Sequence, residues 1–102
     1  MSTDHYKDTV IKIINAHMPH AVIYLFGSRA RNDHKTGADI DIALDAGFSI
    51  PLLTMSVIEE ALEESTIPVT VDLVDVHAVD QNFLNEIKSD WIIWQTPKKT
   101  QP

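Results

Sequence analysis

Cysteine is absent from this chain of 102 residues, and glycine is scarce, with three residues. Without cysteine the chain can form no disulfide, thiol nucleophile or cysteine-ligated zinc site. No apolar run approaches the roughly 20 residues that a membrane-spanning helix needs, and the polar, acidic opening residues do not resemble a secretory signal. We therefore expect a protein of a reducing compartment, the cytoplasm, with no membrane attachment.

Basic residues are also few, because 8 Lys and Arg face 15 Asp and Glu and leave a net charge of -7. A phosphate backbone would repel such a chain, so nucleic-acid binding, including polymerisation on a template, is disfavoured. Three of the basic residues nevertheless crowd together: Arg29, Arg31 and Lys35. A small positive area on an acidic protein suits a compact anion better than a long polyanion.

Hydrophobic periodicity predicts an α/β fold, α+β in the stricter sense, with a small mixed sheet and helices mainly on one side of it. The length fits one domain over residues 1–95, and the polar residues 96–102 are expected to form a flexible tail. The first helix should run from a cap at Ser2 or Thr3 to Pro19. The other expected helices are 28–33, 50–64 (capped by Ser49) and 79–88, and the expected strands are 21–26, 38–44, 69–76 and 91–95.

Gly27 and Ser28 follow the first expected strand, at the point where the chain must turn sharply. Ser28 would open a helical turn whose free N–H groups, together with its hydroxyl, can bind phosphate. Arg29 or Arg31 could add a guanidinium to that site. The alternative for both arginines is an ordinary surface pair with Asp33 or Asp45, which would stabilise little.

Asp39 and Asp41 lie on one face of the next expected strand, about 6–7 Å apart, while Ile40 and Ile42 face the other way. Two carboxylates this close repel each other unless a cation lies between them, and Mg²⁺ prefers oxygen ligands together with substrate phosphates. The alternative is a half-exposed strand with polar residues on its wet face.

A third carboxylate could come from the strand 69–76, which carries Asp72 and Asp75. These two residues point to opposite faces, so only one can join the pair. The residues alone do not decide between them.

The segment Phe26 to Leu44, FGSRARNDHKTGADIDIAL, resembles the signature of the polymerase-β-type nucleotidyltransferases: Gly-Ser, ten residues, then Asp-x-Asp. The strand VTVDLVDV extends the resemblance, and in size the chain is similar to the minimal nucleotidyltransferases. The resemblance implies that Gly27, Ser28 and the nearby Arg29 and Arg31 bind a nucleoside triphosphate. It also implies that the carboxylates bind two Mg²⁺ ions: Asp39, Asp41 and, as the third, Asp72.

Two positions depart from the pattern, since Asn32 replaces a frequent Gly and Ala38 replaces a frequent Ser or Thr. Neither change removes an expected metal ligand.

The resemblance implies Mg²⁺-dependent transfer of a nucleoside monophosphate, AMP from ATP, to a hydroxyl acceptor. Minimal nucleotidyltransferases are paired with helical HEPN proteins, so the expected acceptor is a Tyr of a HEPN toxin, in a hetero-oligomer in which this chain is the antitoxin. The alternative is a non-catalytic or small-molecule-directed subunit that acts by binding a HEPN chain. The five His and the Glu residues of 59–64 are interpreted as structural or surface groups, and Trp91 and Trp94 are expected on opposite faces of the last strand.

Overall fold

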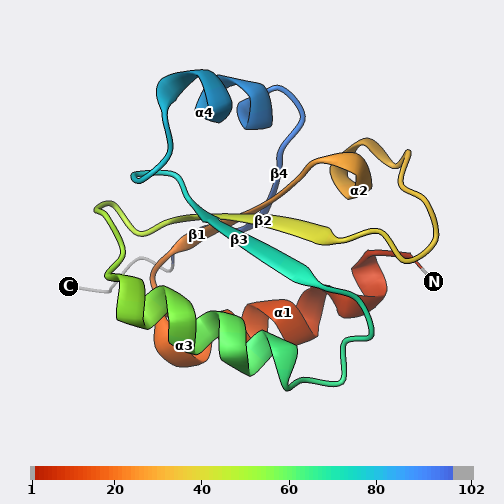
Figure 1. Cartoon of the computed structure of the whole chain (residues 1–102), viewed down its shortest axis with the longest axis horizontal. Helices are drawn as coiled ribbons and strands as arrows, with labels where there is room; N and C mark the ends of the chain where they lie inside the picture. Colours follow the sequence, from red (N-terminus) through yellow and green to blue (C-terminus); the bar gives the residue numbers. More distant parts are fainter. Residues whose placement is uncertain (1, 98–102) are drawn as a thin grey trace.

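The computed structural model describes residues 2–97 and shows a four-stranded sheet with helices on both faces (Figure 1). The elements are α1 Asp4–His17, β1 Val22–Phe26, α2 Ser28–Arg31, β2 Ile40–Asp45, α3 Leu52–Glu63, β3 Val71–Asp75, α4 Gln81–Lys88 and β4 Ile92–Gln95. The predicted α/β class and element order are confirmed. Of the predicted tail, Thr96 and Pro97 lie in no helix or strand, and residues 98–102 fall outside the described part. Within residues 2–97, no helix is both long and apolar enough to span a membrane.

The sheet is mixed, as predicted, with the strand order β3-β2-β1-β4. β1 runs antiparallel to both β2 and β4, whereas β2 and β3 run parallel. The register places Asp41 of β2 opposite Phe26 of β1 and opposite Asp72 of β3. Residues directly opposite each other share a face of the sheet, so these three side chains gather on one surface.

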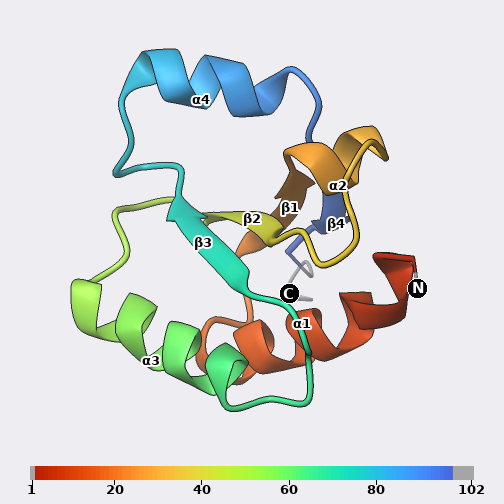
Figure 2. The same ribbon diagram turned by 45° about the vertical axis from the view of Figure 1, so that its right-hand side comes forward.

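The main core lies between the sheet and the two longest helices, α1 and α3, which run side by side below it in Figures 1 and 2. The alternate β2 residues Ile40, Ile42 and Leu44 are fully buried there, as their spacing predicts. The other main-core residues are Val10, Ile14, Ile23, Leu25, Ile50, Ile58, Leu62 and Trp94. Because this core takes every second β2 residue, Asp41 and Ala43 must point to the opposite face.

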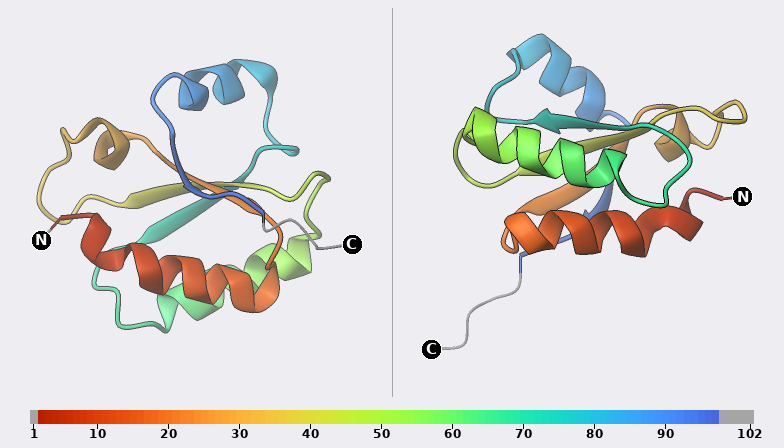
Figure 3. Two further views of the ribbon diagram at one scale, coloured as in Figure 1. Left: turned by 180° about the vertical axis from the view of Figure 1, so that it is seen from behind. Right: turned by 60° about the horizontal axis from the view of Figure 1, so that its bottom comes forward.

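That opposite face is partly covered by α2 and α4 (Figures 1 and 3). A smaller apolar cluster joins the sheet to α4: Phe26, Ala43, Val76 and Ile87. The two longest helices, α1 and α3, thus share one side of the sheet, as expected, while α4 packs on the other side. An apolar stripe predicts that a helix packs on a sheet but not on which face. Trp91 stacks on Tyr24 with ring centroids 3.6 Å apart on this face, while Trp94 lies in the main core, as predicted for the two indoles.

Two predicted helix caps are used differently. Thr3 precedes α1, but its side chain makes no cap bond and its hydroxyl instead accepts a hydrogen bond from Arg29 Nη1 at 3.0 Å. The expectation that Ser49 caps α3 is wrong, since Pro51 holds that position and Ser49 Oγ donates to the carbonyl oxygen of His77 at 3.2 Å.

The side chain of Asp75, at the end of β3, holds the loop that leads into α3. It is buried, with 6% of its surface exposed. Its Oδ2 accepts a hydrogen bond from the Ile50 amide at 2.7 Å, and its Oδ1 accepts one from the His77 amide at 2.9 Å. Asp75 therefore holds two loops together.

We predict that Asp75→Ala lowers the free energy of unfolding by about 1–3 kcal/mol, the usual cost of leaving buried hydrogen-bonding groups without a partner. Urea denaturation measures this change. Asp72→Ala is the matched control on the same strand, because Asp72 is exposed and its loss should leave stability within about 0.5 kcal/mol. An equal loss of unfolding free energy in the two variants would contradict the structural role given to Asp75.

Candidate active site

Three carboxylates gather where β2 and β3 begin, on the face that carries α2 and α4. Parallel pairing sets Asp41 opposite Asp72, and Asp39, just before β2, is near enough to Asp72 to raise the pKa of that carboxyl group. The predicted grouping of Asp39, Asp41 and Asp72 on one surface is therefore what the fold produces. Asp75 belongs to the other face, so the choice that the residues alone left open falls on Asp72.

The electrostatics of the site reflect this crowding. Burial raises the pKa of Asp41 above its ordinary value, and the charges of Asp72 and Asp39 raise it further, while Arg29 and Arg31 act in the opposite direction. Asp72 is exposed as a residue, but partial burial of its carboxyl group raises its pKa, and the nearby carboxyl group of Asp39 and the charge of Glu59 raise it further. Such carboxylates would be stabilised by a cation, which favours their charged form.

Gly27 allows the chain to turn from β1 into α2 directly against Asp41. Its φ of 76° is one that residues with a side chain rarely adopt. A Cβ added at this position would collide with Oδ2 of Asp41 and lie 3.3 Å from its Cγ. Because residue 27 has no side chain, the turn can lie directly against the Asp41 carboxylate.

Arg29 is buried next to the site, and its guanidinium makes hydrogen bonds within the protein. Its side chain is buried, with 7% exposed, and Nε and Nη2 both donate to the carbonyl oxygen of Ala38, at 3.0 and 2.7 Å. Its Nη1 donates to Thr3. Arg29 thus fixes the backbone just before Asp39, which differs from the predicted contact with a nucleotide.

Arg31 lies on the exposed side of α2 and makes the kind of surface pair that the sequence offered as an alternative. Its Nε lies 3.1 Å from Asp33, and its Nη1 lies 2.8 Å from Asp90, after α4. Ser28 and Arg31 also line an open depression of about 510 Å³ that includes Lys35. The lining of this depression combines the basic Arg31 and Lys35 with the acidic Asp33.

Glu59 of α3 is a site neighbour that sequence reasoning missed, having interpreted it as a solvated surface residue. Its charge contributes to the raised pKa of Asp72, and the two residues line a common pocket. No local pattern could indicate this, because the proximity arises from how α3 packs beside β3.

The donor set suits Mg²⁺ in character, although protein atoms alone do not enclose an ion. Among residues 2–97, no three acidic or histidine side chains stand close enough together to hold one metal, so the expected three-carboxylate cage is not present. Mg²⁺ commonly takes one or two carboxylates and completes its shell with water and substrate phosphates. Asp39, Asp41 and Asp72 meet that lesser requirement.

Comparison with known proteins agrees with the arrangement. The family model described as Polymerase beta, Nucleotidyltransferase matches residues 8–99. A Haemophilus influenzae protein named "Probable protein adenylyltransferase MntA" is 28% identical over 88 residues, which are 86% of this chain and 77% of that protein.

Solved structures share the fold. A toxin–antitoxin with AMP-PNP superposes with a TM-score of 0.77 at 24% identity, covering 90% of this chain and 74% of the other. A tri-AMPylated Shewanella oneidensis HEPN toxin in complex with its MNT antitoxin gives a TM-score of 0.72 at 23% identity, covering 91% of this chain and 71% of the other. The family match over residues 8–99 confirms the resemblance seen in the Gly-Ser and Asp-x-Asp motifs.

We predict that Gly27→Ala destabilises the fold more than Gly47→Ala, measured as the free energy of unfolding. Both glycines have positive φ, but only Gly27 would meet Asp41, and a Cβ at Gly47 meets nothing within 4 Å. Backbone strain of about 1–3 kcal/mol applies to both, so the excess at Gly27 reports the collision. Combining Gly27→Ala with Asp41→Ala should remove that excess, and an unchanged excess in the double variant would show that the contact is misplaced.

Proposed function

Because the chain belongs to the polymerase beta, nucleotidyltransferase family, we propose that it transfers a nucleoside monophosphate from a nucleoside triphosphate to a hydroxyl acceptor. The observation that carries the proposal is the gathering of Asp39, Asp41 and Asp72 beside the Gly27 turn. The strand register holds these carboxylates together although they repel one another. Nothing in the described fold needs them to be adjacent, so a purely structural role does not explain their position.

In this proposal the side chains have separate tasks. Gly27 and Ser28 hold the phosphates through the free N–H groups of the turn and the serine hydroxyl, and Arg31 supplies positive charge nearby. Asp39 and Asp41, with Asp72 sharing, hold two Mg²⁺ ions. Bound Mg²⁺ would neutralise charge on the phosphate oxygens and on the attacking and leaving oxygens.

The reaction would be an in-line displacement. The acceptor oxygen forms a bond to the α-phosphorus, the bond from that phosphorus to the oxygen bridging to the β-phosphate breaks, and pyrophosphate leaves. The proton of the acceptor hydroxyl passes to the Asp72 carboxylate.

We further propose ATP as the donor and a tyrosine of a helical HEPN partner as the acceptor, so that this chain is an antitoxin acting in a hetero-oligomer in the cytoplasm. Support comes from relatives, one named as a protein adenylyltransferase and one seen in complex with an AMPylated HEPN toxin.

A second candidate is a subunit that neutralises its partner by contact alone. The exposed apolar side chains at the start of α3 favour it, because Leu52 is 85% and Leu53 78% exposed, and such a patch is typical of a protein interface. Neutralisation by contact alone would give Asp39, Asp41 and Asp72 no function.

The deciding experiment incubates the chain with α-labelled ATP, Mg²⁺ and the HEPN protein encoded beside it. We expect label on the HEPN chain, with loss of transfer when EDTA removes the metal. Asp39→Ala/Asp41→Ala should reduce the rate by about 100-fold or more, because losing a single electrostatic contact to a transition state already costs about 10²–10³ in kcat. Asp8→Ala is the control, an exposed carboxylate on α1 that should leave the rate unchanged.

Absence of transfer by the wild-type chain would defeat the enzymatic proposal. If the double variant still neutralises the partner completely, contact alone suffices and the second candidate is correct.

A further inference from the structure

The outer face of α3 is divided into an apolar half and an acidic half. The apolar half, at the start of the helix, exposes Leu52, Leu53 and Val57. The acidic half, at its end, exposes a group of glutamates that we call the α3 glutamates: Glu59, Glu60, Glu63 and the adjoining Glu64. In Figures 2 and 3, α1 and the sheet lie on the inner side of α3, and within residues 2–97 no helix or strand covers its outer side.

The charge of the α3 glutamates is not compensated within the described chain. Residues 48–70 include no Lys, Arg or His, and among residues 2–97 no ion pair includes an α3 glutamate. The last turn of α3 carries no basic residue, so the glutamates lie at the helix end where the dipole is negative and repels them. A cationic partner would relieve this repulsion, whereas a phosphate would add to it.

The apolar half indicates that the partner is a protein and not a free cation. Neighbouring exposed apolar side chains are typical of protein interfaces, and Leu53 and Val57 lie one helical turn apart on the same side of α3. From Leu52 to Glu63 the surface is about 17 Å long, at a rise of 1.5 Å per residue. It fits a partner segment with apolar side chains at one end and Lys or Arg at the other.

The acidic half adjoins the carboxylate site. Glu59, Glu63 and Asp72 line one groove of about 370 Å³ between α3 and the start of β3. Only residues 64–70 separate the end of α3 from β3, so the acidic end of the helix is the one nearest to the carboxylates. A partner segment with its basic end over the α3 glutamates therefore reaches Asp72.

The strand order puts this groove on the side of the site away from the Gly27 turn. Gly27 and Ser28 follow β1, and the order β3-β2-β1 places Asp41 between that turn and Asp72. In the proposed reaction the triphosphate lies at the turn, and an in-line displacement needs the attacking oxygen opposite the leaving pyrophosphate. An acceptor that enters through the groove beside Asp72 meets this requirement.

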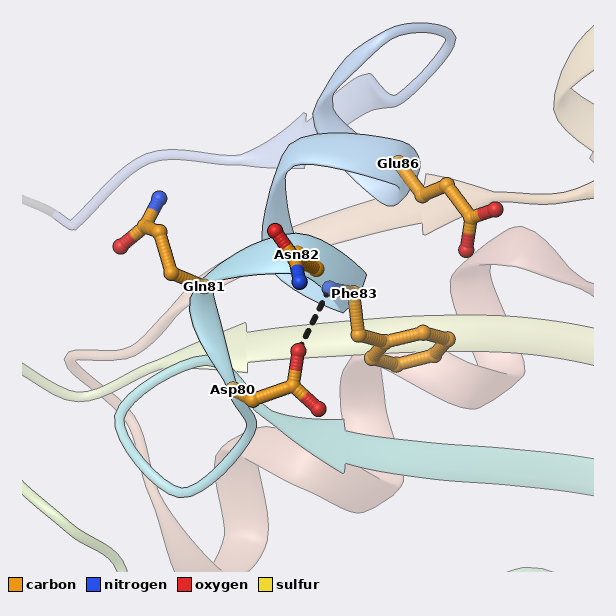
Figure 4. Close-up of a pocket in the computed structure, with 5 residues that line it drawn as sticks. All are labelled: Asp80, Gln81, Asn82, Phe83 and Glu86. Carbon is orange, nitrogen blue, oxygen red and sulfur yellow. Dashed lines mark hydrogen bonds between the residues drawn. The ribbon is translucent and has the colours of Figure 1, made fainter.

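The depression beside α4, shown in Figure 4, offers no such approach. It measures about 500 Å³, and its lining includes none of the three carboxylates. Its Phe83 packs edge to face on Phe26, with ring centroids 6.4 Å apart. Phe26 and Asp72 lie on opposite sides of Asp41, so a partner bound at α4 would lie away from Asp72.

We infer that the outer face of α3 is the docking surface for the partner that carries the acceptor hydroxyl. Apolar residues of the partner pack on Leu52, Leu53 and Val57, and Lys or Arg residues close to the acceptor lie over the α3 glutamates. The assignment rests on the proposed function and deepens it, by naming where the partner binds and how its charge is arranged.

The test measures binding of the HEPN chain and AMP transfer to it in two variants that spare the carboxylate site. Leu52→Ser/Leu53→Ser removes most of the apolar half. We expect the Kd and the KM for the HEPN chain to rise about tenfold or more, as for the loss of interface anchors, with the Kd of Mg·AMP-PNP within about twofold of wild type.

Glu60→Lys/Glu63→Lys reverses charge in the acidic half and leaves Glu59, a close neighbour of Asp72, in place. We expect a similar rise in Kd and KM at low salt. The difference from wild type should shrink as salt is added, because salt screens exposed charges.

Two control variants make the same kinds of change elsewhere. Ile92→Ser/Ile93→Ser removes exposed apolar side chains from β4, and Asp8→Lys/Glu86→Lys makes the same change of net charge on α1 and α4. Both should leave partner binding and transfer within about twofold of wild type. Urea denaturation of each variant identifies any loss of fold.

Unchanged partner binding and KM in both α3 variants, or equal losses in the controls, would overturn the inference and leave the proposed function intact. A rise in the Kd of Mg·AMP-PNP as large as the rise in KM would also overturn it, by placing α3 on the nucleotide side. If the wild-type chain binds its partner but transfers nothing, the proposed function fails, while weaker binding by the α3 variants would still support the docking surface.

Discussion

The electrostatic repulsion among Asp39, Asp41 and Asp72 is the constraint around which this small protein is arranged. Parallel pairing of β2 with β3 sets two of the carboxylates opposite each other, and the third contacts Asp72. Burial, and then the neighbouring carboxylates, raise the pKa values of Asp41 and Asp72 above their ordinary value. A cation bound beside these carboxylates would favour their charged form.

Several features of the fold maintain this unfavourable group. Gly27 leaves room for the Asp41 carboxylate, and Arg29, buried in a role unlike the predicted one, fixes the Ala38 carbonyl before Asp39. The main core buries alternate β2 residues such as Ile42 and so fixes the opposite orientation of Asp41. Packing of the main core on one face of the sheet thereby fixes the orientation of Asp41 on the other face.

Much of this arrangement could be predicted from the sequence because its determinants are local. Alternation along 38–44 indicated which face Asp41 takes, and the Gly-Ser turn followed by the Asp-x-Asp spacing indicated the family. The rest depends on contacts between distant segments. The role of Arg29, the proximity of Glu59 and the contact of Phe83 with Phe26 arise from packing, which leaves no periodic mark. Alternation placed Asp72 and Asp75 on opposite faces of β3 but could not say which of them shares the face of Asp41, because that depends on the register of β3 against β2.

The central proposal, that these carboxylates bind divalent cations beside the Gly27 turn, is tested most directly by titrating Mn²⁺ into the isotopically labelled chain. Paramagnetic Mn²⁺ broadens the NMR signals of amides close to it. The account predicts that the signals of residues 27–28, 39–41 and 72 are lost first, and that Asp39→Ala/Asp41→Ala abolishes this selectivity. Strongest broadening at the glutamates of α3, residues 59–64, with the carboxylate segments unaffected, would contradict it.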